Sequence, residues 1–255
     1  MIEKVKGLVI KTQNINENDK WLTVLCEEYG KISFKAAGVR SFKSKNLASA
    51  QPFAYSEFTL LRTNNFTRMN EAQIIENFYD LRLDIASLAL AAYIAEIAGI
   101  ICVEEDDAGI LRLLLNSLHV LANKKLNRRV IKAVFELRVL SKSGFLPNLE
   151  ECEICGKKCD GNNLEIMFFD VIGGNLVCAD CVDKINKNNP AKLIRISRDV
   201  LIAMKFVSSV RDEKLFAFAL HEDIEKEFAN VCEKYLLAQI NLNIDSLRQY
   251  KNYEK

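Results

Sequence analysis

Five of the eight cysteines in this 255-residue chain crowd into one segment, and four of them form two Cys-x-x-Cys pairs. The pairs are Cys152 with Cys155 and Cys178 with Cys181, and 22 residues separate them. A short Cys-x-x-Cys turn brings two thiolates and nearby backbone amides to one point, and zinc favours four such ligands in a tetrahedron. Clustered cysteines favour metal binding in a reducing cytoplasm. The spacing therefore predicts a structural Zn²⁺ site with these four cysteines as ligands.

Two alternatives stay open at this site. Cys159 lies four residues after Cys155 and could compete as a ligand, although Cys152 gives two matching pairs. Disulfides would require an oxidising compartment, and a thioredoxin-like redox pair would require a βαβ pattern that is absent here. A catalytic zinc is not expected, because it usually keeps an open position and the two histidines, His119 and His221, lie far away in helical contexts.

Short strands are expected in the first 75 or so residues, where apolar and polar side chains alternate. We expect these strands at residues 5–10, 21–27, 31–37, 52–61 and about 69–75. Five short strands without a long intervening helix predict a small closed or nearly closed barrel, since closure removes exposed strand edges.

Helical spacing replaces the alternation after about Asn77. We expect helices at residues 81–95, 110–121, 130–140, 199–210 and 222–241, and two short strands of the cysteine element at 164–169 and 175–177. The longest apolar stretch, residues 88–103, contains Tyr93 and Glu96 and falls short of the roughly 20 apolar residues that span a bilayer. It is expected to be a buried helix, with no membrane partner. Gly144 followed by Pro147 predicts the end of the third helix.

Charge is segregated along the chain, although the formal net charge is only +1. The first basic stretch, residues 31–69, contains seven basic residues and one acid. The second basic stretch, residues 120–142, has the same composition of seven to one, whereas residues 76–111 contain eight acids and one arginine. Basic segments of this kind are candidate surfaces for nucleic acid or acidic peptides.

The first basic stretch is the candidate DNA-binding surface, because single-strand binders combine a basic groove with aromatic side chains on which bases stack. Phe42 is flanked by cations on the loop after the third strand and is the preferred stacking residue. Trp21 and Phe66 are further candidates that are equally compatible with core packing. The expected DNA-binding residues are Lys35, Arg40, Phe42, Lys43, Lys45 and Arg68.

The second basic stretch lies on an expected helix whose Val130, Val134 and Leu137 should face inward, so that its cations should face largely outward. It could extend a DNA path or receive an acidic peptide. An ordinary solvated helix face is an equally good interpretation.

Taken in order, several short motifs resemble those of RecO, a family of bacterial DNA-repair mediators. They are Gly7-Leu8-Val9-Ile10, Asn18-Asp19, Glu28-Tyr29-Gly30-Lys31, Gly38-Val39-Arg40, Gln51-Pro52-Phe53, Gly144-Phe145-Leu146-Pro147 and the segment from Cys152 to Cys181. The likeness runs from residue 5 to about 185. Cys159 is an additional thiol, Cys26 stands where a hydroxyl is expected, and residues 247–250 match the family's ending only loosely.

The resemblance implies an α+β protein with an OB-fold barrel at residues 1–76. A helical domain at 77–255 would follow, with a zinc ribbon-like insertion at about 149–185. It further implies a cytoplasmic, nucleoid-associated protein that binds single- and double-stranded DNA and anneals complementary strands. Together with RecR, such a protein promotes RecA loading onto single-stranded DNA coated with single-strand-binding protein (SSB). The resemblance implies that the acidic C-terminal tail of SSB binds to Arg128, Arg129 and Lys132.

The alternative function is a zinc-stabilised protein-interaction scaffold without direct DNA binding. An enzyme is not expected, because the sequence has no Walker loop, no dinucleotide glycine fingerprint and no paired histidine and carboxylate set suited to hydrolysis.

Overall fold

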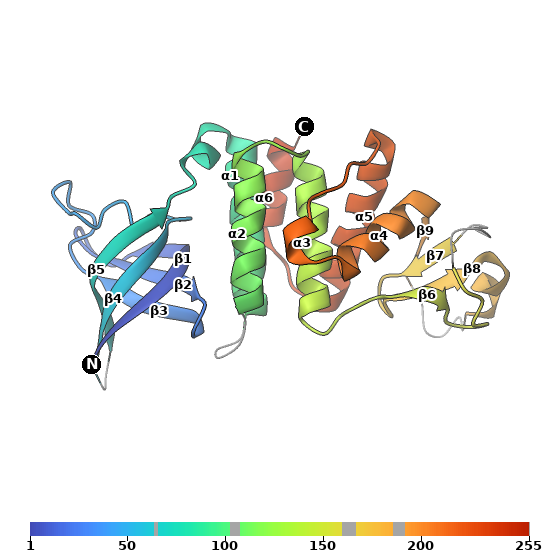
Figure 1. The fold of residues 1–255 in the computed structure, drawn as a ribbon, viewed down its shortest axis with the longest axis horizontal. Coiled ribbons are helices and arrows are strands. Elements are labelled where there is room, and N and C mark those ends of the chain that lie inside the picture. Colours follow the sequence, from blue (N-terminus) through green and yellow to red (C-terminus); the bar gives the residue numbers. More distant parts are fainter. Residues whose placement is uncertain (64–65, 103–107, 160–166, 186–191, 255) are drawn as a thin grey trace. The chain divides into compact units, whose positions relative to one another are not determined.

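The computed structural model describes residues 1–63, 66–102, 108–159, 167–185 and 192–254 (Figure 1). Its helices and strands are β1 (Ile2–Asn14), β2 (Lys20–Cys26), β3 (Gly30–Ala36), β4 (Tyr55–Arg62), β5 (Thr67–Glu76), α1 (Ile85–Ile101), α2 (Ala108–Ala122), α3 (Arg128–Lys142), β6 (Asn148–Cys152), β7 (Met167–Asp170), β8 (Asn175–Cys178), β9 (Leu193–Ile196), α4 (Arg198–Ser209), α5 (Glu222–Ile240) and α6 (Asp245–Tyr253). The chain forms two compact units, residues 1–124 with 244–255 and residues 125–243.

The first unit contains a closed five-stranded barrel with the order β1-β2-β3-β5-β4, which confirms the expected OB-fold. The strands pair antiparallel except β3 and β5, which pair in parallel. The long strand β1 closes the barrel, because residues 2–8 pair with β4 and residues 7–14 pair with β2. The strand order therefore leaves one short seam, between β3 and β5.

The barrel core consists of the inward side chains of the alternating pattern. Leu22, Val24 and Phe34 are fully buried, and the Phe34 ring meets Phe58 edge to face at 5.4 Å between centroids. The expected strand bounds were wrong in two places. The first strand starts before residue 5, because its beginning pairs with β4, and the fourth starts after residue 52, because Phe53 turns the backbone at φ +65°.

Helices α1, α2 and α6 complete the first unit. The apolar stretch from residue 88 lies in α1, where Leu90, Ile94 and Ile97 are fully buried, and residue 103 lies outside the described residues. The C-terminal helix α6 packs beside α1 (Figure 1) and buries Tyr250 completely. Among the described helices, none is both long and apolar enough to cross a membrane.

The second unit places α3 against α4 and α5, and attaches a four-stranded sheet of order β6-β8-β7-β9. Helix α3 ends before Gly144, whose φ is +89°, as the glycine and proline pattern predicts. The cysteine element is larger than the expected pair of strands. Its strand β6 runs parallel to β8, and its fourth strand, β9, follows residue 185. Residues 164–166 of the first expected strand lie outside the described residues, and the domain limits stay a prediction.

Candidate nucleic-acid interface and metal centre

One row of side chains crosses the outer face of the barrel from β1 to β5. Gln13 pairs with Trp21, Trp21 with Lys35, and Lys35 with Arg68, so the strand register places all four side chains on the same face. We call these residues the outer row. Trp21 is 38% exposed, the Lys35 side chain is 42% exposed, and Arg68 is exposed. The outer row therefore presents one aromatic and two cationic side chains to a ligand.

Asp19 fastens the loop after β3 beside the outer row. Its carboxylate accepts a hydrogen bond from the Gly38 amide at 2.9 Å and lies 2.8 Å from the Lys35 ammonium. The backbone amide of Arg40 donates to the Asn18 carbonyl at 3.0 Å, and its guanidinium donates to the Asn16 carbonyl. The hydrogen-bonded Lys35, with help from the Gly38 amide, lowers the pKa of Asp19 to about 2.

The six expected DNA-binding residues share the first unit but differ in what holds them. Phe42 is 98% exposed, and Lys45 lies 2.7 Å from the Glu71 carboxylate. Within the described part of the chain, neither Lys43 nor Arg68 has an acid at ion-pair distance. An exposed pair such as Lys45 with Glu71 contributes about 0 to 1 kcal/mol, so a phosphate can displace it.

Lys132, by contrast, does not face outward, and that expectation was wrong. Its side chain is only 3% exposed, and its ammonium lies 2.7 Å from Glu136 and 2.8 Å from Glu233. Burial alone would lower the pKa of Lys132, but the two carboxylates raise it overall. The reason for the burial is that α3 packs against both α4 and α5, which leaves little of the helix surface to solvent.

Other cations of the second basic stretch are also engaged. Arg138 lies 2.8 Å from Asp212 and donates hydrogen bonds to the carbonyls of residues 207, 208 and 210 at the end of α4. Lys142 lies 3.0 Å from the same aspartate. Arg128 and Arg129 are half-buried in the first turn of α3. The stretch therefore offers much less free charge than its composition suggests.

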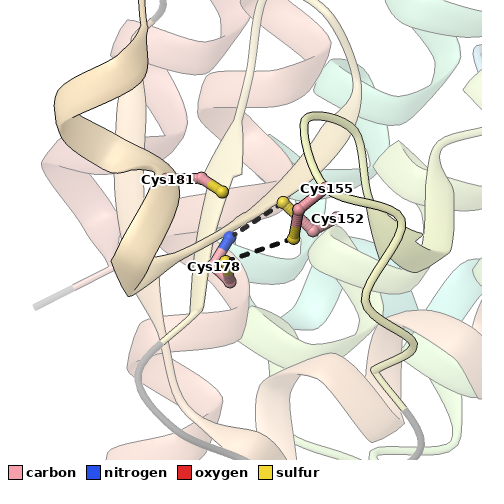
Figure 2. A group of neighbouring side chains, drawn as sticks. All are labelled: Cys152, Cys155, Cys178 and Cys181. Carbon is pink, nitrogen blue, oxygen red and sulfur yellow. Dashed lines mark hydrogen bonds between the residues drawn. The ribbon is translucent and has the colours of Figure 1, made fainter.

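The four paired cysteines meet at one point, although they come from separate segments. Figure 2 shows Cys152 at the end of β6 and Cys155 on the turn that follows. Opposite them lie Cys178, at the end of β8, and Cys181, in the following 3-10 helix. Their sulfur atoms all lie within 4.8 Å of one another, an arrangement that could hold a metal ion. The Sγ atoms of Cys155 and Cys178 are 3.7 Å apart. That separation is close to the roughly 3.8 Å edge of a tetrahedron with Zn–S bonds of about 2.3 Å.

Backbone amides stabilise negative charge on one sulfur of this cluster. Although burial opposes ionisation, the amides of Cys178, Cys155 and Ile154 lower the pKa of Cys152 to about 6, and the Cys178 amide lies 3.4 Å from its sulfur. Burial and the neighbouring sulfurs raise the pKa of Cys181 to about 12. A bound divalent cation would offset the repulsion among the thiolates.

The fifth thiol of the segment lies outside this cluster. Cys159 is buried, and its sulfur lies 4.0 Å from the sulfur of Met167. Among the described residues, the group that could hold a metal contains the four paired cysteines and not Cys159.

Comparison with known proteins shows the family over nearly the whole chain. The model described as "Recombination protein O N terminal" matches residues 1–78, and "Recombination protein O C terminal" matches residues 82–248. The chain belongs to the RecO family. It is similar to the protein named "DNA repair protein RecO" of Acetivibrio thermocellus, with 30% identity covering 99% of this chain and 97% of the relative. The RecO proteins of Caldicellulosiruptor saccharolyticus and Clostridium novyi are 28% and 29% identical over 97% and 100% of this chain, and over 97% and 95% of their own lengths.

RecO proteins are DNA-repair proteins of a recombination mediator family that is not generally enzymatic, which agrees with the expectation from the sequence. Sequence reasoning overlooked Asp19 as the residue that joins the loop to the barrel. A signal was available, since an Asn-x-x-Asp turn before a strand is a common site of side-chain to backbone hydrogen bonds.

Proposed function

We propose that this RecO-family protein binds single- and double-stranded DNA through the outer row and the adjoining basic loop, residues 38–45. The observation that carries the proposal is the register that aligns Trp21, Lys35 and Arg68 across three strands. Cations that neutralise phosphates supply affinity without reading sequence, and an exposed aromatic supplies a surface for bases. Phe42 on the basic loop adds a second, fully exposed aromatic.

A binding experiment tests this surface directly. Fluorescence anisotropy of a labelled oligothymidylate is measured across a salt series for the wild type, for a Lys43→Ala, Arg68→Ala variant, and for a Lys4→Ala, Lys6→Ala control. The control removes the same charge from exposed positions on the β1 and β4 side of the barrel. We expect weaker binding and a shallower log–log slope for the first variant alone, by about 0.7 per lost phosphate contact. Equal losses of DNA affinity in both variants would mean that binding depends only on the net charge of the protein.

We also propose that binding leads to annealing of complementary strands and, with RecR, to RecA loading on DNA coated with SSB in the cytoplasm. We expect the acidic SSB tail to bind Arg128 and Arg129 rather than Lys132, because Lys132 is buried between two acids. Both arginines lie in the first turn of α3, where the helix terminus also favours negative charge. Loss of SSB-tail binding in an Arg128→Ala, Arg129→Ala variant would support this assignment.

The cysteine cluster, we propose, holds a structural Zn²⁺. Four thiolates close the coordination shell, so the ion would stabilise the β6-β8-β7-β9 sheet and activate no water. Native mass spectrometry of freshly purified protein should find one zinc per chain. Cys155→Ser should abolish this mass, whereas Cys159→Ser should retain it. Retention of the metal by Cys155→Ser with its loss in Cys159→Ser would reverse the ligand assignment.

A further inference from the structure

The barrel closes at the seam between β3 and β5 through a short pairing. Among the described residues, these strands pair at Lys35 with Arg68 and at Ala36 with Met69, although β3 begins five residues earlier, at Gly30. In the described part of the chain, the first half of β3 pairs with β2 alone. A cavity of about 690 Å³ opens at this end of the seam, and we call it the seam cavity. Its size falls within the roughly 300 to 1,000 Å³ of ordinary ligand pockets.

An aromatic ring and a guanidinium group line the seam cavity together. The Arg62 guanidinium carbon lies 4.9 Å from the centre of the Tyr29 ring, a cation–π contact. Glu3, whose side chain is 9% exposed, lies 3.3 Å from Arg62 Nε. The Glu3 carboxylate also lies close enough to the Tyr29 phenol to raise the pKa of Tyr29. Glu3 therefore holds the Tyr29 and Arg62 side chains next to each other at the edge of the seam cavity.

The charge balance indicates what kind of group could enter. Lys31 and Glu28 also line the seam cavity, so its two cations face two acids when Glu3 is included. The hydroxyl side chains of Ser33 and Thr67 complete the polar lining. Such a site does not favour a phosphate over water. It suits a neutral planar group with hydrogen-bond donors and acceptors, and nucleobases stack readily on aromatic rings and on arginine planes.

The seam cavity lies next to the outer row along β3 and β5. Ser33 lies two residues before Lys35 on β3, about 6.6 Å along the strand and on the same face. Lys35 and Arg68 mark the paired end of the seam, where a DNA phosphate would bind. A DNA strand whose phosphate is bound there would have a neighbouring base at the seam cavity.

We propose that the seam cavity takes one unpaired nucleobase of a bound DNA strand, with the Tyr29 and Arg62 pair as its stacking surface. The inference rests on the DNA-binding function proposed above and adds a source of strand preference. A base can enter only after leaving its partner, and this penalty is smallest in single-stranded DNA.

The test compares a labelled oligothymidylate with an abasic strand of the same length and charge. For the wild type we expect roughly five- to tenfold tighter binding of the oligothymidylate, with equal salt slopes for both strands. Tyr29→Ala should remove most of this difference. Tyr79→Ala should retain it, because Tyr79 is exposed and lies outside the barrel strands.

Equal affinity of the wild type for the two strands would overturn the nucleobase site while leaving DNA binding through phosphates intact. Failure to bind either strand would overturn the proposed function itself. If Tyr29→Ala does not fold, Tyr29→Leu replaces it, because leucine keeps an apolar side chain against the barrel core, and an unchanged preference for the oligothymidylate overturns the inference. If both DNA strands bind equally and a protein partner protects the β3 amides from hydrogen exchange, the seam cavity would instead bind an extended peptide.

Discussion

The two basic stretches carry the same net charge in the sequence, but their cations have different surroundings in the structure. In the first stretch, Phe42, Lys43 and Arg68 are exposed on the barrel or on the loop attached to it. In the second stretch, Lys132 and Arg138 are held by acids on segments more than 70 residues further along the chain. Charge counts therefore identify a candidate surface only after the partners brought by folding are known.

The largest effect should come from the buried ion cluster of the second stretch. Lys132→Met leaves Glu136 and Glu233 near each other without a cation, and we expect a loss of about 3 to 5 kcal/mol in the free energy of unfolding. Urea denaturation followed by circular dichroism measures this loss. Lys124→Ala, an exposed cation of the same stretch, is the control and should change stability by less than about 0.5 kcal/mol. Similar values for both variants would contradict the difference between buried and exposed cations.

Arg138 should have the next largest effect. Arg138→Ala leaves three carbonyls at the end of α4 without their donor, and we expect a loss of about 2 kcal/mol in unfolding free energy. Arg138→Lys should lose less, because it keeps the charge beside Asp212 but not the planar fork of donors. If the lysine variant were as unstable as the alanine variant, the charge would be irrelevant and the fork alone would matter.

The first stretch should show the opposite behaviour, a loss of binding without a loss of stability. Lys43→Ala with Arg68→Ala should weaken oligothymidylate binding about tenfold at low salt. The same variant should unfold within about 0.5 kcal/mol of the wild type, since its cations lack ion-pair partners in the described chain. Anisotropy and urea denaturation on one preparation measure both quantities. A destabilised variant would remove the contrast between the two stretches.

The smallest effect concerns Asp19, the acid that holds a cation of the first stretch. Because its folded pKa of about 2 lies below the usual value, its stabilising contribution is present above about pH 4 and is lost as the pH falls through about 2. Lys35→Met should move the carboxyl titration, followed by NMR, toward its usual range. Asp19→Asn should strengthen DNA binding roughly twofold by releasing Lys35. Weaker binding would show that positioning of the basic loop outweighs the released charge.

Local patterns in the sequence were sufficient for several parts of this protein. The two Cys-x-x-Cys pairs predicted the cluster of four cysteines, because each short turn is a local structure. Only the approach of the two turns to each other had to be inferred. Alternating side chains predicted β2 and β3, and Gly144 predicted the end of α3, since these features depend on neighbouring residues.

Tertiary structure alone decided the features that depend on distant residues. These include the return of α6 to α1, the addition of β9 to the cysteine sheet, and the seam that leaves a cavity between β3 and Arg62. Most of all, it decided which cations remain exposed, because Lys132 meets Glu233 only when α3 packs against α5. Sequence determines which residues carry charge, whereas the free energy of burying that charge depends on partners that folding brings together.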